Sequence, residues 1–427
     1  MAHVVVLGAG VGGLPTAYEI RHQLGSAHTV SLINSADTFQ FVPSNPWVLV
    51  GWRKPSQVSV PLSRVLARKH IEFILGIAAK IDAELKSVEM ADGRQVPYDY
   101  LVIATGAKLA FDEIPGLGPE GLTQSVCTLD HSLSGLAAYQ EFLKNPGPVV
   151  VGAAQGASCF GPAYETAFII DADLRKRKLR NRVPMTFVTS EPYIGHLGLG
   201  GVGDSKGMIE SKLRERNITF ITNAKIKQAS DGKLEVIEHD ADGKELRTHQ
   251  VPFTFGMVLP AFKGVDAVAS VPGLCNPRGF VQVDEHQRSK KYSNIFGLGV
   301  SIAIAPPVPT PVPTGVPKTG YMIESMVTAT VANIVGEIEG KPADRTATWN
   351  AVCLADMGDT GMAFVALPQI PPRNVTWARE GRWVHLAKIG FEKYFLRKMR
   401  TGATDPFYEK WAFKTLGIKR LEEKRPV

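Results

Sequence analysis

The chain opens with a short apolar run, a glycine-rich turn and a helical pattern, in that order. The stretch HVVVLGAGVGGLPTAYEIRHQL places Gly8, Gly10 and Gly13 in the spacing G-x-G-x-x-G. A second apolar run, TVSLIN, ends at Asn34, about 20 residues beyond the last of these glycines. Two strand-like runs on either side of such a turn are typical of a βαβ unit that binds a dinucleotide. The pattern predicts an α/β fold built on a doubly wound sheet.

The glycines of this turn have separate physical roles. Gly8 permits the tight turn, Gly10 lets a pyrophosphate approach the backbone, and Gly13 lets the helix pack on the strand. The helix offers its unpaired N–H groups to the anion. Asn34 departs from the pattern, because an acidic residue normally stands there to bind ribose hydroxyls. An amide still hydrogen-bonds a hydroxyl, so we expect the site to keep its ligand.

The stretch VVVGAAQGASCFGPAYE, residues 149–165, resembles a second turn of this kind whose glycines have been replaced. Gly152, Ala154 and Ala157 occupy the three glycine positions. The methyl group of Ala154 stands where a pyrophosphate must come close, and no acidic ribose ligand follows the next strand-like run. The sequence therefore predicts a second Rossmann-like domain that binds NADH poorly. Cys159 stands where the helix of this unit should begin.

The four cysteines, Cys127, Cys159, Cys275 and Cys353, are widely separated, and none belongs to a CxxC or Cys/His cluster. This spacing argues against a zinc site and against a secreted disulfide framework. The N-terminus lacks a signal-peptide pattern and no apolar run is long enough to span a bilayer, so we expect neither a signal peptide nor a transmembrane helix.

Positive charge is concentrated near the C-terminus. The formal net charge is +7, and residues 373–427 carry 14 Lys or Arg against six Asp or Glu, a surplus of +8. The asymmetry indicates a separate functional surface at this end of the chain. No nucleic-acid-binding motif accompanies the basic residues, so we expect no nucleic acid partner.

Two further segments outline a split first domain. YDYLVIATGA, residues 98–107, and GFVQVDEHQRSKKYSNIFGLGV, residues 279–300, resemble the second and third signatures of flavoproteins with two dinucleotide-binding domains. In the third signature Val300 replaces the usual Asp. The expected boundaries are an FAD-binding domain at residues 1–145 and 285–345, a second Rossmann-like domain at residues 146–284, and a C-terminal quinone and membrane region at residues 346–427.

Longer motifs identify a family, since the chain resembles a sulfide:quinone oxidoreductase over essentially its whole length. The motifs that carry this resemblance are FQFVPSNPWV (39–48), GASCFGPAYE (156–165), EPYIGHLG (191–198), PKTGYMIESM (317–326) and WNAVCLADMGD (349–359). The resemblance implies that sulfide is oxidised to polysulfide or elemental sulfur. It also implies FAD as the cofactor and a membrane quinone as the electron acceptor. The resemblance favours noncovalent FAD, and Cys127 leaves covalent attachment open.

The resemblance implies that Cys159 and Cys353 lie on either side of a channel at the flavin, whereas Cys127 matches a third position whose role varies and Cys275 matches no family motif. Hydrosulfide opens a sulfur bridge between the pair, and re-forming the bridge releases two electrons. The family favours Cys353 as the thiolate nearest the flavin and Cys159 as the sulfur acceptor, but the residues alone leave the order open. We expect nearby charge to keep the thiolates ionised. Proton handling is expected from Glu165, and His131 and His196 match family positions near the sulfide side, although a purely structural role stays open for each.

The family also implies sets of binding residues. The residues expected to contact FAD are Gly8, Gly10, Gly12, Gly13, Asn34, Ser35, Phe41, Ile77, Ala78, Thr105, Gly106, Gly299, Val300, Lys318 and Gly320. Those expected to line the quinone channel are Phe41, Gly320, Lys388, Phe391 and Tyr408.

Two candidate helices, over residues 379–402 and 405–424, combine aromatic and basic residues. Aromatic side chains on one face and Lys or Arg on the other predict helices that lie in an anionic membrane interface. An amphipathic helix packed on its own core is the alternative. We therefore expect a peripheral membrane protein. The sequence leaves the membrane face open and is compatible with a homo-oligomer.

Two other flavoenzymes are compatible with parts of this pattern. A type II NADH:quinone dehydrogenase would share the fold, but the altered second turn and the cysteines argue against it. The flavoprotein subunit of a flavocytochrome c sulfide dehydrogenase would normally carry a secretion signal and covalent flavin, which this N-terminus does not suggest. A sulfur-binding module without enzymatic activity is a more remote alternative.

Overall fold

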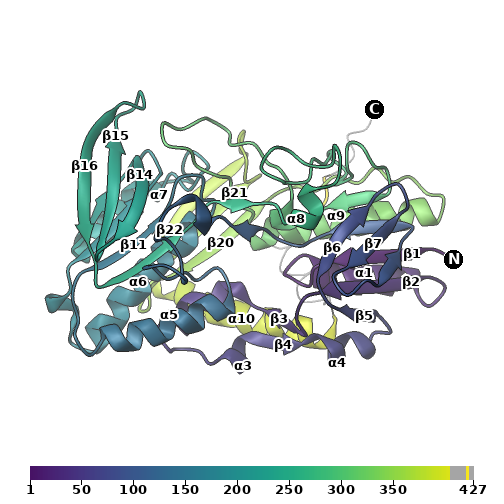
Figure 1. Ribbon diagram of the computed structural model, residues 1–427, viewed down its shortest axis with the longest axis horizontal. Helices are drawn as coiled ribbons and strands as arrows, with labels where there is room; N and C mark the ends of the chain where they lie inside the picture. The colour runs from purple at the N-terminus through teal and green to yellow at the C-terminus, as the bar shows by residue number, and fades with distance from the viewer. Residues whose placement is uncertain (404–419, 423–427) are drawn as a thin grey trace.

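The structure is a computed structural model that describes residues 1–403 and 420–422. Figure 1 shows an elongated molecule with the N-terminal sheet at one end and a second α/β unit at the other. Strands and a long helix from the C-terminal part of the chain lie between them.

A five-stranded parallel sheet forms the centre of the first domain. Its strands lie in the order β19 (Ile295–Gly297), β9 (Tyr100–Ile103), β1 (His3–Leu7), β2 (Thr29–Asn34) and β5 (Glu72–Leu75). The side chains of Val4, Val5 and Val6 are fully buried, as a parallel strand covered on both faces requires. Helices α1 (Gly13–Leu24) and α9 (Gly320–Ile338) pack against each other beside this sheet.

A four-stranded parallel sheet forms the second domain, in the order β13 (Ile218–Ile221), β12 (Met185–Thr189), β11 (Val149–Ala153) and β17 (Phe255–Leu259). The main helices of this domain are α6 (Phe160–Lys176) and α7 (Ser205–Glu215), and α5 (Leu129–Phe142), which precedes the domain in the chain, packs on its core. An antiparallel sheet of β14 (Ala224–Ser230), β15 (Lys233–His239) and β16 (Glu245–Pro252) projects from its end (Figure 1). The two parallel sheets confirm the predicted α/β fold with two Rossmann-like units.

An antiparallel sheet and a long helix follow residue 346, namely β20 (Ala351–Asp356), β21 (Gly361–Leu367), β22 (Val375–Glu380) and α10 (Arg382–Thr401). Strand β20 contacts α6, α9 and α10. Ala351, Met362 and Phe364 join the core of the second domain, whereas Phe395 and Met399 of α10 join the core of the first. Burial of each large apolar side chain is worth about 1.5–3 kcal/mol. The C-terminal elements therefore hold the two domains together.

The remaining elements are short. They are β3 (Thr38–Gln40), η1 (Val42–Ser44), α2 (Asn45–Leu49), α3 (Pro55–Val58), β4 (Ser59–Pro61), α4 (Leu62–Ala67), β6 (Ala78–Asp82), β7 (Ser87–Met90), β8 (Gln95–Pro97), β10 (Lys108–Leu109), η2 (Phe111–Glu113), η3 (Arg180–Arg182), β18 (Phe262–Lys263), α8 (Asp266–Ala269) and η4 (Gly299–Ser301).

Helix α10 is present where the first C-terminal helix was predicted, but the prediction for its faces is wrong. Lys388, Glu392 and Lys398 are buried, whereas Trp383 and Leu386 are 49% and 66% exposed. The charged side chains turn inward because each has a partner in the body of the protein: Lys388 pairs with Glu165, Glu392 with Arg53 and Lys398 with Glu324. The second candidate helix, residues 405–424, lies largely outside the described residues. In the part of the chain that the structure describes, no helix combines the length and apolarity needed to cross a bilayer.

Candidate active site

The first glycine turn leaves room for a ligand at the N-terminus of α1. Gly8 has φ +103°, and a Cβ there would collide with the carbonyl group of Ala104. A Cβ on Gly13 would meet the carbonyl oxygen of Gly8, so helix and strand come together as the pattern requires. At Gly10 no atom would lie within 4 Å of an added Cβ, so this backbone faces open space. The turn therefore fits a dinucleotide pyrophosphate.

Asn34 has a second function that the sequence did not indicate. Its Oδ1 accepts a hydrogen bond from the backbone N–H of Ala9 at 3.0 Å, and its Nδ2 donates to the carbonyl oxygen of Ala36 at 2.8 Å. The side chain thus fixes the glycine turn to the end of β2. One lone pair and one N–H of the amide are left for a ribose hydroxyl.

Six other residues predicted to contact FAD follow the carboxyl ends of strands in the same sheet. Thr105 and Gly106 come after β9, Gly299 and Val300 come after β19, and Ile77 and Ala78 come after β5. Open sheets of parallel strands bind their ligands at this edge. An added Cβ would meet no atom within 4 Å at Gly106 or at Gly320, the first residue of α9. The donor set and the open backbone therefore fit FAD.

Three cysteines gather near the N-terminus of α9. Cys159 is the N-cap residue of α6, Cys353 lies within β20, and Cys127 precedes α5. Cys159 interacts electrostatically with Cys127 and with Lys318, whereas the thiol of Cys353 is hydrogen-bonded to Thr319. Because Lys318 and Thr319 are adjacent, the surroundings of Cys159 and Cys353 meet at this point of the chain. Cys275 lies elsewhere, and its Sγ contacts the carbonyl oxygen of Val268 at 3.4 Å.

The prediction that nearby charge keeps the thiols ionised is wrong. Burial raises the pKa of Cys159 to about 12 and that of Cys353 to about 11, although Lys318 and Lys388 respectively oppose the shift. Burial also raises the pKa of Cys127 to about 11. The same desolvation lowers the pKa of the Lys318 ammonium to about 8. All four cysteines are free thiols in the structure, and burial favours their protonated form.

Glu165 and Lys388 form a buried ion pair between α6 and α10. Burial raises the pKa of Glu165 to about 7, and the opposing effect of Lys388 does not cancel this shift. The backbone N–H of Asp356 also supports the Glu165 carboxylate. The carboxylate of Asp356, itself fully buried, accepts hydrogen bonds from the indole of Trp47 at 2.7 Å and contacts Nδ1 of His385 at 2.7 Å. Glu165 thus lies in a polar cluster next to the strand that carries Cys353.

The two predicted histidines lie close in the chain or in space to the cysteine segments. His131 is in the first turn of α5, just after Cys127, and its ring packs against Phe111. His196 belongs to a loop whose Gly198 lies against Phe160, the residue after Cys159. Burial lowers the pKa of both imidazoles, and among the described residues neither Nδ1 has a hydrogen-bond partner.

Three of the predicted quinone residues are close together. The ring centroid of Phe41 lies 5.9 Å from that of Phe391 and 5.2 Å from that of Phe395. Lys388 lies about one turn before Phe391 on the same helix. Phe41 is buried, whereas Phe391 is 38% exposed, so the aromatic cluster reaches the surface. Tyr408 lies outside the described residues.

The second turn is covered by the chain itself. The N–H of Gly156 donates to the carbonyl oxygen of Pro313 at 2.6 Å, and the N–H of Gly315 donates to that of Ala157 at 2.8 Å. The side chains of Ala154 and Ala157 are fully buried. The proline-rich loop around residues 305–317 therefore packs on the turn where a second dinucleotide would approach.

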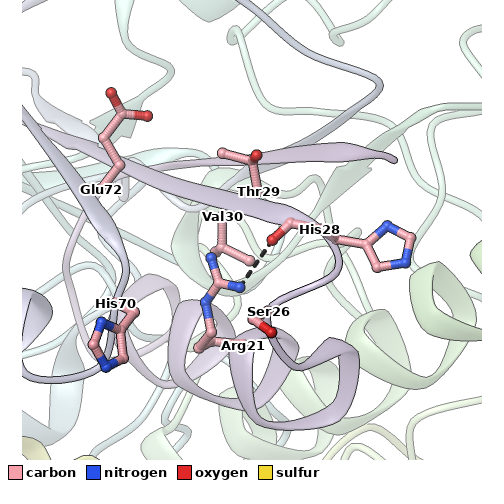
Figure 2. A pocket seen from close by; sticks show the side chains of 7 residues that line it. All are labelled: Arg21, Ser26, His28, Thr29, Val30, His70 and Glu72. Carbon is pink, nitrogen blue, oxygen red and sulfur yellow. Dashed lines mark hydrogen bonds between the residues drawn. The ribbon is translucent and has the colours of Figure 1, made fainter.

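A surface depression of about 360 Å³ lies at the opposite edge of the first sheet (Figure 2). Its lining includes His28 and Thr29 at the start of β2 and His70 and Glu72 at the start of β5. Arg21 spans it and donates to the carbonyl oxygen of His28 at 2.9 Å. None of the predicted site residues lines this depression.

The fold and the cysteine cluster define an oxidoreductase with two Rossmann-like domains and a thiol-based site. Residues 2–167 match the family model described as pyridine nucleotide-disulphide oxidoreductase. The chain is 45% identical to the sulfide-quinone reductase of Aquifex aeolicus over 409 residues, which is 95% of this chain and 93% of that protein. The chain therefore belongs to the sulfide-quinone reductase family.

Solved structures agree with this assignment. The crystal structure of the sulfide:quinone oxidoreductase from Aquifex aeolicus superposes with a TM-score of 0.94 at 44% identity, covering 99% of this chain and 97% of that chain. NDH2 from Plasmodium falciparum, solved in complex with NADH, superposes with a TM-score of 0.72 at 14% identity, covering 98% of this chain and 99% of that chain. The second likeness shows the fold alone.

Proposed function

We propose that this protein oxidises sulfide and delivers the electrons to a quinone, with FAD as its bound cofactor. The observation that carries this proposal is the meeting of the Cys159 and Cys353 surroundings at Lys318 and Thr319, beside the ligand-binding edge of the first sheet. Membership of the sulfide-quinone reductase family supports the same conclusion.

FAD would be held by the residues predicted for it, with the pyrophosphate at Gly8, Gly10, Gly12 and Gly13 and the α1 N-terminus. When bound, FAD supplies two-electron chemistry, because it accepts an electron pair from sulfur and passes the pair to a quinone. Residues 1–145 and 285–345 form the domain that holds it, and residues 146–284 place Cys159 beside it.

The sulfur chemistry belongs to Cys159 and Cys353, joined in the resting enzyme by a sulfur–sulfur link. Hydrosulfide attacks the sulfur on Cys159, a new sulfur–sulfur bond forms there, and the bond to Cys353 breaks. The products are a persulfide on Cys159 and a thiolate on Cys353. After the persulfide loses its proton, its terminal sulfur bonds to the Cys353 sulfur, and the two electrons that this oxidation releases would be accepted by bound FAD. Each turnover adds one sulfur to the link, so the product leaves as polysulfide or elemental sulfur.

The buried environment disfavours a lasting thiolate. Because desolvation raises the pKa of Cys353 to about 11, the sulfur released there takes up a proton unless it re-forms a sulfur–sulfur bond with transfer of two electrons to bound FAD. Glu165, with a pKa of about 7 set by burial, takes up the persulfide proton. His131 and His196, kept neutral by burial, each have one ring N–H that can donate a hydrogen bond to hydrosulfide, and Cys127 serves as a nearby third thiol.

The quinone binds at Phe41, Gly320, Lys388, Phe391 and Tyr408, and the protein attaches to the membrane through α10. Trp383, Leu386 and Phe391 are exposed apolar side chains on this helix, and exposed Lys393 and Arg397 follow them. Exposed aromatic and aliphatic side chains next to basic residues suit an anionic membrane surface. Attachment is therefore peripheral.

An anaerobic visible spectrum tests this proposal. Sulfide added to the flavin-loaded protein should bleach the flavin absorbance, and a quinone should restore it. Cys159→Ala and Cys353→Ala should each abolish the bleaching by sulfide while the flavin stays bound and dithionite still reduces it. A wild-type spectrum that sulfide leaves unchanged, or full bleaching in either variant, contradicts the proposal.

A further inference from the structure

Helix α6 and strand β20 carry the two cysteines, and buried contacts fix these elements to each other. Cys159 caps the N-terminus of α6, and Cys353 lies within β20. The turn between β20 and β21 packs on the C-terminal half of α6, where a Cβ on Gly358 would come within 2.5 Å of Ala172. This contact is far from both thiols. We therefore expect it to affect the relative position of the two sulfur atoms and not the pKa of either thiol.

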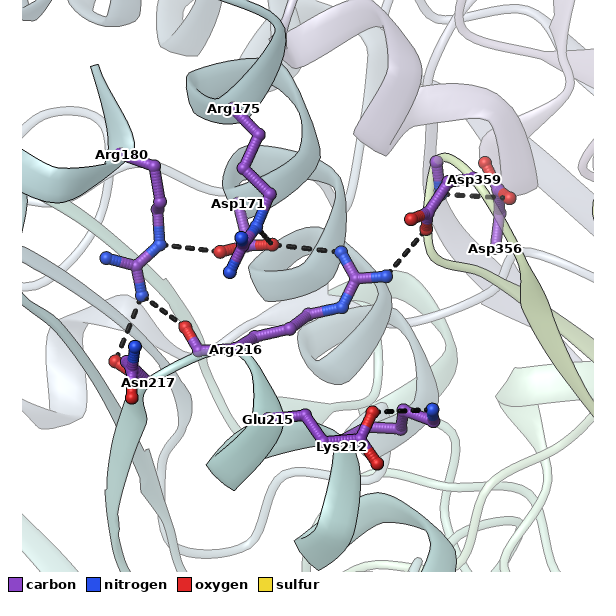
Figure 3. A network of polar contacts seen from close by, with 10 residues as sticks. Asp171, Arg175, Arg180, Lys212, Glu215, Arg216, Asn217, Asp356 and Asp359 are labelled. Atoms are coloured by element: carbon purple, nitrogen blue, oxygen red, sulfur yellow. Dashed lines mark hydrogen bonds and ion pairs between the residues drawn. The ribbon is translucent and has the colours of Figure 1, made fainter. Parts of the chain in front are cut away.

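Asp171 is the centre of an ion-pair network at this contact (Figure 3). Its carboxylate is fully buried and accepts from Arg175 at 2.8 Å, from Arg180 at 2.5 Å and from Arg216 at 2.9 Å. Arg180 also donates to the backbone carbonyl oxygen of Arg216 at 2.6 Å, which fixes the end of α7. A single buried carboxylate therefore organises three guanidinium groups.

Arg216 differs from the other two arginines because it reaches the turn between β20 and β21. Its Nη1 contacts Asp171 on α6, and its Nη2 contacts Asp359 in the β20–β21 turn at 2.6 Å. The guanidinium also lies over the ring of Phe168, another buried α6 residue. The planar fork of an arginine can hold two carboxylates at a fixed geometry, which a lysine cannot do.

We propose that Arg216 is a positioning residue that sets the separation of Cys159 and Cys353 by bridging Asp171 of α6 to Asp359 of the hairpin that carries Cys353. The inference rests on the proposed function, because it concerns the sulfur link between these cysteines. Formation of that link requires a narrow range of distances and angles between the sulfur atoms. The bridge holds the β20–β21 hairpin at a fixed position along the axis of α6.

Asp359→Ala tests the bridge from its exposed end. The Asp359 side chain is 67% exposed, and Arg216 keeps Asp171 as a partner when Asp359 is lost, so stability should change little. Arg175→Gln is the matched control, because Arg175 also pairs with Asp171 but is 46% exposed and has no contact with Asp359 in the described network. Arg216→Lys keeps a positive charge near Asp171 and removes the bridge.

Two measurements on flavin-loaded protein are needed. The first is the rate of anaerobic flavin reduction by sulfide. The second is the fraction of chains that carry a Cys159–Cys353 sulfur link after mild oxidation, measured by mass spectrometry after denaturing alkylation. In Asp359→Ala the rate should fall about threefold to fivefold, and in Arg216→Lys at least tenfold. The linked fraction should fall at least twofold in both variants, with flavin content retained. Asp359→Glu should recover most of both values, and Arg175→Gln should stay within twofold of wild type.

The outcomes separate the bridge from the proposed function. One outcome is that sulfide bleaches the wild-type flavin while Asp359→Ala and Arg216→Lys show the same reduction rate and the same linked fraction as the wild type. That result refutes the positioning role of Arg216 and leaves the proposed function intact. A loss equally large in Arg175→Gln also refutes it, because the network would then act only through general stability. A wild type that sulfide does not bleach refutes the proposed function instead.

Discussion

Replacement of Lys388 by methionine should move the titration of Glu165 to higher pH. Burial raises the pKa of Glu165 to about 7 even with the Lys388 ammonium in contact. An opposite charge at such a distance typically lowers a carboxyl pKa by about 1–3 units. Without it, burial and the negative charge of Asp356 remain, so we expect a midpoint of about 8 or above. Each unit corresponds to about 1.4 kcal/mol.

The same shift has a consequence for stability. Glu165 has a higher pKa in the folded protein than the ordinary glutamate value of 4.5, so its contribution to stability is complete below pH 4.5 and is lost as pH rises through about 7. In Lys388→Met the loss should continue to about pH 8 or above. The melting temperature of the variant should therefore fall further behind that of the wild type between pH 7 and 9.

Infrared difference spectra of the oxidised protein provide the direct assay, because a protonated buried carboxyl group has its own C=O band. Glu165→Gln identifies the band, and no sulfide is present to titrate in the same range. Lys398→Met is the matched control, since Lys398 is a second buried lysine of α10 that pairs with Glu324 at 3.2 Å. An unchanged midpoint of about 7 in Lys388→Met, or an equal shift in Lys398→Met, would refute the coupling of Glu165 to Lys388.

Two further outcomes follow from the covered turn and from the exposed face of α10. NADH should leave the flavin spectrum unchanged under anaerobic conditions, because Pro313 and Gly315 are hydrogen-bonded to the turn at Gly156 and Ala157; rapid bleaching by NADH would show that this loop does not block the site. Trp383→Ser combined with Leu386→Ser should weaken co-sedimentation with anionic vesicles about tenfold or more, because a buried apolar side chain is worth about 1.5–3 kcal/mol. Leu85→Ser, at another exposed leucine, is the control for that measurement, and equal vesicle binding by both variants would contradict membrane attachment through α10.

Local patterns in the sequence were sufficient for the two parallel sheets. The glycine turn at Gly8, Gly10 and Gly13 predicts a strand, a turn and a helix because each glycine meets a steric need within a short stretch of chain. The altered glycine pattern of the second turn could also be interpreted from the sequence, since the methyl group of Ala154 stands where a pyrophosphate must come close. Local patterns did not predict the cysteine cluster. Only the long family motifs indicated that Cys159 and Cys353, which are far apart in the sequence, lie close together.

Long-range partners explain what the sequence did not predict. The stretch GMAFVAL of β21 is a continuous apolar run, and such a run has no period that separates a strand from a helix. The prediction of which side chains of α10 are exposed was wrong, because the partners of its buried charges lie far away in the chain, at Glu165, Arg53 and Glu324. The thiol pKa values likewise depend on burial, which a motif does not report.

Helix α10 joins the sulfur site, the predicted quinone site and the exposed apolar face. Lys388 contacts Glu165 beside the Cys353 strand, Phe391 contacts Phe41, and Trp383 and Leu386 face outward. The C-terminal half of the same helix supplies Phe395 and Met399 to the core of the first domain. Removal of the helix would therefore damage folding together with all three functions, and its effects could not be assigned to any one of them. Point substitutions can separate them, because the exposed side chains lie on one face of the helix, and the ion-paired and core side chains on the buried face are distinct positions that can be replaced one at a time.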